Sequence, residues 1–250
     1  MKIAVCLKRV PDTEMRFTIA ADGKSIDAAG LKYEISTFDE YAVEVALRLN
    51  EQQGPGEVIV VGAGPDGLAE LLRKALSLGA DRAIHLTAAE VPFDPMAVAE
   101  GLAAELRDLS CDLILFGRNA TDTGTGGVGA MTASLLGLPC VTAVSHLDIT
   151  AAGGTAQRTL EGATETVTFP LPAVLSIDEG IARPRIASLK GIMAAKKKPL
   201  DAKPARFGTP RLTVQKLEPP PERAQGRILG TGADAVPELV RVLRDEAKVL

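Results

Sequence analysis

The chain has 250 residues and a formal net charge of −4, with 46% hydrophobic and 24% charged residues. This composition is typical of a globular protein with a full core and excludes an intrinsically disordered chain. Aromatic residues make up only 3%, without a Trp, so stacking of bases on aromatic platforms is not expected. The slightly acidic balance provides no general attraction for nucleic acid or anionic lipid, and neither is expected as a partner.

The three cysteines, Cys6, Cys111 and Cys140, lie in or beside apolar runs, so we expect buried thiols in a reducing compartment. The sequence has no Cys-x-x-Cys pattern, and we expect no metal site. Residues 1–5 lead directly into a strand-like run, and no apolar stretch approaches the roughly 18 residues of a membrane span. We therefore expect a cytoplasmic protein, or a mitochondrial matrix protein in a eukaryote, without membrane insertion.

Strands and helices are expected to alternate along the first 145 residues. Buried strands are predicted at residues 3–7, 58–62, 82–86, 113–116 and 140–144. Thr37 followed by Glu40 predicts a capping box at the start of the first helix, and Asp94-Pro95 predicts the start of another. The apolar stripe at 68–76 predicts a helix ended by Gly79, and a further helix ends near Gly137.

This order of elements predicts an α/β fold, a mainly parallel doubly wound sheet of the Rossmann-like, adenine-nucleotide-binding kind. Polar–apolar alternation over residues 157–169 predicts an antiparallel addition, and residues 173–177 a further core strand. Residues 17–26 predict a hairpin with a glycine turn.

The C-terminal part of the sequence has a different character. Residues 183–198 are basic, and repeated prolines between 199 and 221 argue against long regular structure. A last helix is predicted at 235–250. We therefore predict an α/β domain at 1–182, a partner-recognition loop at 183–198 and an extended arm with a terminal helix at 199–250. Composition leaves open whether this arm wraps its own domain or another subunit.

A glycine-rich loop at residues 117–132 follows the fourth predicted strand. Such a loop leaves the carboxyl edge of a parallel sheet, where ligands bind. Glycines let the backbone approach a ligand closely, and the free N–H groups of the following helix attract an anion. The hydroxyls of Thr123, Thr125 and Thr132 add donors. The loop therefore predicts a phosphate site, with a plain flexible loop as the alternative, and it matches neither a Walker A motif nor a first-strand dinucleotide fingerprint.

The loops at residues 8–12 and 62–66 each favour a plain turn when taken alone, but they leave the same predicted edge and together could complete a nucleotide pocket. His85 and His146 are interpreted as structural residues. The sequence shows no nucleophile elbow, paired acid motif or metal triad, so no catalytic residue is assigned.

Several stretches of this sequence carry a resemblance to a known family. They are Val-Cys-Leu-Lys-Arg-Val-Pro-Asp at 5–12, Phe-Asp-Glu-Tyr-Ala-Val-Glu at 38–44, Gly-Ala-Asp-Arg-Ala-Ile-His at 79–85, the loop at 117–133, and Pro-Arg-Ile-Ala-Ser-Leu-Lys-Gly-Ile-Met at 184–193. With them, the chain resembles the beta subunit of electron transfer flavoprotein nearly from end to end.

The resemblance implies a heterodimer with an alpha subunit, which holds most of the FAD near the interface, while the beta subunit binds AMP. It also implies that the C-terminal arm and terminal helix at 199–250 pack on the alpha subunit. It implies an electron carrier rather than an enzyme, taking electrons from flavin dehydrogenases to a quinone reductase or another acceptor. The cofactor then performs the chemistry and the protein supplies position and electrostatics.

The resemblance also assigns residues by position. It implies AMP contacts at Cys6, Ser36, Thr37, Phe38, Asp39, Ala63, Asp122, Thr123, Gly124, Thr125, Gly126, Gly127, Val128, Gly129, Ala130, Met131, Thr132 and Ala133. It implies proximity to FAD for Phe38 and Thr13, an interface position for Glu165, and partner recognition by Leu189, Ile192, Met193, Lys196 and Lys197. Leu189 matches the leucine that would insert into a pocket of the dehydrogenase.

Two alternatives remain open at this point. Electron-bifurcating members of the family bind a second FAD in place of AMP and use NADH. Thr125, Val128 and Gly129 agree with their loop pattern, but Gly124 and Gly127 replace its Asp and Gln, which favours AMP. A stand-alone ATP-binding module like the universal stress proteins would share the sheet but would not need the C-terminal tail.

Overall fold

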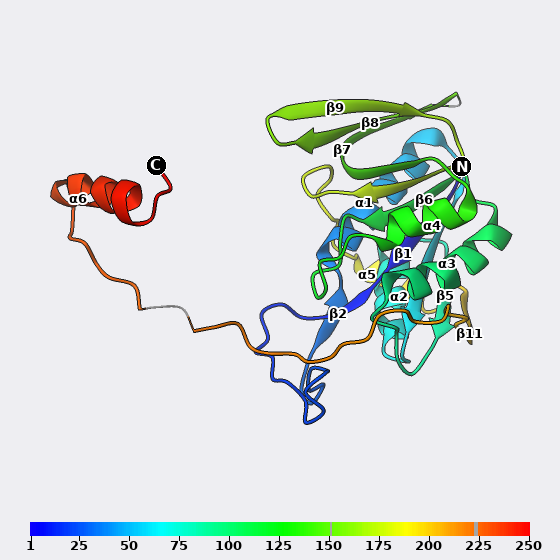
Figure 1. Cartoon of the computed structure of the whole chain (residues 1–250). Helices are drawn as coiled ribbons and strands as arrows, with labels where there is room; N and C mark the ends of the chain where they lie inside the picture. Colours follow the sequence, from blue (N-terminus) through cyan, green and yellow to red (C-terminus); the bar gives the residue numbers. More distant parts are fainter. Residues whose placement is uncertain (151, 223–224) are drawn as a thin grey trace. The chain divides into compact units, whose positions relative to one another are not determined.

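The computed structural model describes residues 1–150, 152–222 and 225–250 (Figure 1). The chain divides into two compact units, Met1–Lys216 and Leu217–Leu250. The first unit contains the sheet, its helices and all the predicted ligand-binding residues, whereas the elements described in the second are short and helical.

Within the described residues, the first unit is built on one nine-stranded sheet in the order β11-β5-β4-β1-β6-β10-β7-β8-β9. Its strands are β1 (Lys2–Leu7), β4 (Glu57–Gly64), β5 (Arg82–Thr87), β6 (Leu113–Gly117), β7 (Cys140–Thr150), β8 (Gly153–Leu160), β9 (Ala163–Phe169), β10 (Ala173–Ile177) and β11 (Leu200–Pro204). The pairs from β11 to β7 are parallel, and β7, β8 and β9 form an antiparallel extension at one end. The predicted α/β fold and its antiparallel addition are confirmed (Figure 1).

Helices cover both faces of this sheet. They are α1 (Thr37–Gln53), α2 (Leu68–Leu78), α3 (Pro95–Leu109), α4 (Val128–Leu136) and α5 (Leu189–Ala195). Successive side chains of a strand point to opposite faces, so Ile3 and Val5 of β1 pack with α1 and α2, whereas Ala4 and Cys6 pack with α3 and α4. β1, β4 and β6 are buried along nearly their whole length, because helices cover both faces of the sheet at these strands.

A small antiparallel sheet lies outside the main one. It pairs β2 (Arg9–Pro11) with β3 (Tyr33–Ile35), and the Arg9 guanidinium lies 3.2 Å from the centre of the Tyr33 ring. The hairpin predicted at 17–26 is reduced to a single antiparallel bridge between Ile19 and Ile26.

Three local predictions are wrong in detail. Ser36, not Thr37, is the N-cap of α1, and no side-chain hydrogen bond caps this helix, so the capping box is absent. Cys140 is exposed at the start of β7, while Cys6 and Cys111 are buried as expected. Residues 200–204, predicted as part of an irregular arm, form β11, because Leu200 and its neighbours pair in parallel with the otherwise open edge of β5. The predicted Asp94 cap of α3 is confirmed by its bond from Met96 N.

The second unit consists of the 3-10 turn η1 (Ala233–Ala235), α6 (Val236–Arg241) and the π-helical turn η2 (Val242–Glu246). The helix predicted at 235–250 thus ends four residues early, at Glu246. Arg241 pairs with both Glu238 and Glu246 across these turns. Among the helices of the described residues, none is long and apolar enough to span a membrane.

Candidate functional site

A cavity of about 520 Å³ opens at the carboxyl ends of the central parallel strands. From β1 the chain proceeds to β4 and β5 on one side of the sheet and then returns to β6 on the other side of β1. The crevice between β1 and β6 is therefore the topological switch point, where open α/β sheets bind their ligands. Its walls include Cys6 and Lys8 from β1 and its exit, Ala63 from β4, and Phe116 and Gly117 from β6.

Asp39, in the first turn of α1, bridges the two sides of this crevice. Its Oδ2 accepts a hydrogen bond from Lys8 N at 2.8 Å, and its Oδ1 accepts one from Gly117 N at 2.9 Å. Burial raises the pKa of Asp39 to about 7, against the opposing effect of these N–H donors and of the Lys8 charge. Both oxygens are engaged by the protein, so Asp39 fixes the spacing of β1 and β6 at the cavity.

Lys8 connects the β1 loop to the glycine-rich loop. Its Nζ donates to Asp122 Oδ1 at 2.7 Å and lies 3.3 Å from Thr123 Oγ1. The lysine side chain is 37% exposed, so this ion pair contributes little to stability and is free to exchange partners. A cation is thereby held at the mouth of the cavity, beside the loop predicted to bind phosphate.

The loop itself fits an anionic ligand. Gly126 has a φ of +60°, a conformation in which a side chain would be strained. The N-cap of α4, Gly127, provides no side chain to the helix, so the first N–H groups of α4 are left to other acceptors. On the cavity wall, the side-chain oxygen Asn119 Oδ1 is buried without a hydrogen-bond partner in the structure. This oxygen is a hydrogen-bond acceptor available to a polar ligand in the cavity.

The structure brings together most of the predicted AMP-binding residues. Those that line the cavity are Cys6, Asp39, Ala63, Asp122, Thr123, Thr125, Gly126, Gly127, Val128 and Gly129. Ser36, Thr37, Phe38, Gly124, Ala130, Met131, Thr132 and Ala133 do not line it. Thr132 and Ala133 are buried on the inner side of α4, and Thr37 and Ala130 are exposed. The contact of each residue with AMP stays a prediction.

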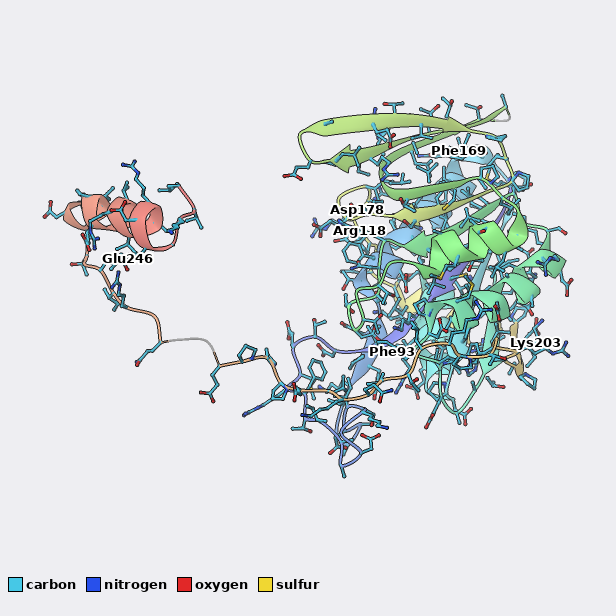
Figure 2. All side chains as sticks on the ribbon, in the orientation of Figure 1. Phe93, Arg118, Phe169, Asp178, Lys203 and Glu246 are labelled. Atoms are coloured by element: carbon cyan, nitrogen blue, oxygen red, sulfur yellow. The ribbon has the colours of Figure 1, made fainter. Side chains whose placement is uncertain are left out.

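The sequence interpretation missed one whole wall of the cavity. It is formed by the segment after β5 and the start of α3: Ala89, Glu90, Val91, Pro92, Phe93, Pro95, Val98 and Leu102. The available signal was topological, because this loop also leaves a parallel strand at its carboxyl end. Arg118 was also missed; it lines the cavity, and its guanidinium pairs with Asp178 at 3.1 Å (Figure 2).

The predicted flavin-side residues lie at the surface of this unit: Thr13 is exposed and Phe38 is half-buried, 6.5 Å from the Tyr41 ring. Glu165 on β9 pairs with Arg158 at 3.3 Å. His85 is buried, with Nε2 2.9 Å from the Gly64 carbonyl, as expected for a structural histidine. His146 lies within β7, beside Asp148. Among the described residues, no cluster of acidic, His and Cys side chains could hold a metal ion.

The predicted recognition residues surround α5. Leu189 and Met193 are 78% and 57% exposed, and Ile192 shares the same outward side. Lys196 and Lys197 are exposed just beyond the helix. The inner side of α5 packs on α2 through the buried Ala195. The segment predicted as a loop therefore contains a short helix that displays apolar side chains next to positive charges.

The sheet order and the switch-point cavity define the chain as a doubly wound α/β protein. The family model of the electron transfer flavoprotein domain matches residues 24–206. Electron transfer flavoprotein subunit beta of Bradyrhizobium diazoefficiens is 39% identical over 254 residues, covering 100% of both chains. The subunits of that name from Bacillus subtilis and Homo sapiens are each 35% identical, covering 100% and 98% of both chains respectively. The chain belongs to the family of electron transfer flavoprotein beta subunits.

Proposed function

We propose that this chain pairs with an alpha subunit and binds AMP in the cavity between β1 and β6, as part of a carrier that takes electrons from flavin dehydrogenases to a quinone reductase or another acceptor. The nucleotide assignment is carried by one observation: the uncapped N-terminus of α4, the glycine-rich loop and Lys8 all lie at the same cavity. The phosphate lies at the N-terminus of α4, where backbone N–H groups and the helix dipole favour an anion.

Different residues of the cavity are proposed to bind different parts of the nucleotide. Lys8 balances the phosphate charge, and the unpaired Oδ1 of Asn119 accepts a hydrogen bond from a ligand hydroxyl or amino group. The cavity wall formed by the segment after β5 and the start of α3 supplies apolar surface for the adenine base, through residues such as Val91 and Leu102. The cavity therefore combines polar groups from the glycine-rich loop with apolar side chains from the segment after β5 and from α3.

The redox cofactor is assigned mainly to the alpha subunit. The flavin supplies reversible uptake of electrons, and this chain contributes position. The absence of Trp from the sequence supports this division, because an isoalloxazine ring needs extended apolar contact. Phe38 and Thr13 are proposed to face the flavin from the beta side.

Nucleotide analysis tests the cavity assignment. The heterodimer is purified with its cofactors and denatured, and the released nucleotides are separated and quantified. One FAD and one AMP per heterodimer support the proposal. Two FAD without AMP would instead favour the electron-bifurcating type, and a chain that purifies alone with ATP would favour the stand-alone module.

Electron-transfer kinetics test the docking role of Leu189. Leu189→Ala is expected to raise the KM of the heterodimer for a dehydrogenase at least tenfold, because an exposed anchor that fills a partner pocket is worth about 2 kcal/mol. AMP and FAD content should stay unchanged. Leu160→Ala, at an exposed leucine of β8, is the matched control and should behave as the parent protein. Unchanged kinetics for Leu189→Ala would refute the anchor.

A further inference from the structure

The docking segment, defined here as residues 183–198, is attached to the domain by polar contacts at its two ends and by the packing of α5 on α2 between them. Its apolar side chains point away from the core: Ile186, Leu189 and Met193 are 95%, 78% and 57% exposed. Hydrophobic burial therefore contributes little to its position, apart from Ala195. Hydrogen bonds and ion pairs must therefore hold the exposed side chains of the segment in one conformation.

At the first end, Arg185 reaches two carboxylates of α1. Its Nε donates to Glu44 Oε2 at 2.8 Å, and its Nη1 donates to Glu51 Oε1 at 2.6 Å. The backbone N of Arg185 also donates to Glu44, at 3.2 Å. A single arginine thus fixes both the side chain and the main chain of the segment against one helix.

Glu44 is the unusual member of this cluster, because its side chain is only 3% exposed. Burial opposes its ionisation, but hydrogen bonds from Arg185 and Arg48 outweigh burial and hold the pKa of Glu44 below its usual range. The charged form is therefore retained inside the domain at a desolvation cost. Buried ion pairs of this kind contribute little net stability, and their best-attested use is to select one arrangement.

At the second end, Lys198 and Arg73 tie the segment to α2. Lys198 Nζ donates to the carbonyls of Leu76, Gly79 and Ala80 at 3.1, 3.1 and 2.6 Å. A cation at a helix C-terminus is favoured by the helix dipole. Arg73 Nη1 donates to the carbonyls of Ala195 and Lys198. Lys198 is thus engaged by its own domain, whereas Lys196 and Lys197 remain exposed.

We propose that Arg185 is a positioning residue for electron transfer: through Glu44 and Glu51 it holds the docking segment in the conformation that a dehydrogenase binds. The inference rests on the proposed docking role of Leu189. Without the arginine, the segment samples other conformations, and apparent affinity falls in proportion to the fraction that remains competent. A competent fraction of about one tenth raises KM about tenfold. Because the bound complex is unchanged, kcat at saturating partner concentration stays near the parent value.

The test uses the holo-heterodimer with dehydrogenase as the varied partner. Arg185→Ala, Leu189→Ala and the double variant are compared with Arg183→Ala, which removes the same charge from an exposed residue two positions away. AMP and FAD content confirm that each variant is assembled. Glu51→Gln removes only the 58% exposed carboxylate and provides a milder variant where Arg185→Ala does not assemble. Limited trypsin digestion at Lys190 reports directly on order in the segment.

We expect Arg185→Ala to raise KM about tenfold with kcat nearly unchanged, Glu51→Gln to raise it less, and both to accelerate cleavage at Lys190. Because the competent fraction multiplies the affinity of whatever contacts remain, the KM increases of Arg185→Ala and Leu189→Ala should multiply in the double variant. A normal KM for Arg185→Ala, or an unchanged rate of cleavage at Lys190, overturns the positioning role. A normal KM for Leu189→Ala overturns the docking role itself, and the two failures are thus told apart.

Discussion

Gly117→Ala probes the closest approach between the two sides of the cavity. A Cβ on Gly117 would lie 2.7 Å from Asp39 N and 2.7 Å from the Phe38 carbonyl carbon, and would overlap Asp39 Oδ1. Two of these neighbours are backbone atoms at the start of α1, so no side-chain rotation relieves the contact. The substitution therefore pushes α1 away from β6.

The expected cost has two parts. Overpacking of a close contact costs about 1–3 kcal/mol. Displacement of Asp39 weakens its bonds from Lys8 N and Gly117 N, and a hydrogen bond to a charged group is worth about 1.5–3 kcal/mol. Together they predict a loss of about 3–5 kcal/mol, which corresponds to a fall in Tm of about 10 °C for a chain of this size. AMP should be lost as well, because the crevice between β1 and β6 widens.

Thermal unfolding of the heterodimer and quantification of released AMP measure these effects. Gly226→Ala is the matched control, because a Cβ there meets nothing within 4 Å and its backbone is not left-handed. The control should keep both Tm and AMP. Full AMP content together with an unchanged Tm in Gly117→Ala would refute the argument that Asp39 and Gly117 set the shape of the cavity.

Further predictions concern the charged groups of the same unit. Lys8→Met should reduce AMP retention about tenfold or more at low salt with little change in stability, as measured by equilibrium dialysis; salt-independent, parental retention would contradict it. Asp39→Asn should flatten the pH dependence of stability: the raised pKa of Asp39 gives a contribution that is full below about pH 4 and lost as pH rises to about 7. If the free energy of unfolding of Asp39→Asn and of the parent protein changed with pH in the same way, this prediction would be contradicted. Lys198→Met should lower the free energy of unfolding by about 2 kcal/mol, as measured by chemical denaturation. An unchanged value would show that water replaces the Lys198 ammonium at the carbonyls that follow α2.

Local patterns were sufficient for the central elements of the fold. Buried apolar runs predicted β1, β4, β5, β6 and β10, because a strand covered on both faces needs apolar side chains at nearly every position. The Asp94-Pro95 pair predicted the start of α3 because capping is decided within one helical turn. The position of the glycine-rich loop at a carboxyl edge followed from the alternation of strands and helices.

Partnerships between distant residues could not be predicted in this way. The polar, proline-bounded run Leu200–Pro204 became β11 only because β5 offers an open edge. The same holds for Asp39, which was assigned to the nucleotide by resemblance, although the structure engages both its oxygens with Lys8 N and Gly117 N. Its role depends on the distance between two strands that are 110 residues apart in sequence, as in the pairing of Ile3 with Leu113.

The sequence by itself determined the fold class, the family resemblance and the loop expected to bind phosphate, since each depends on residue types at short spacing. Only the tertiary structure decided how the cavity is closed, through the wall from Ala89 to Leu102, and how the docking segment is held, through Arg185 on the buried Glu44. The physical reason is that burial and charge pairing depend on which distant segments meet, and a desolvated carboxylate is recognisable only once its surroundings are known.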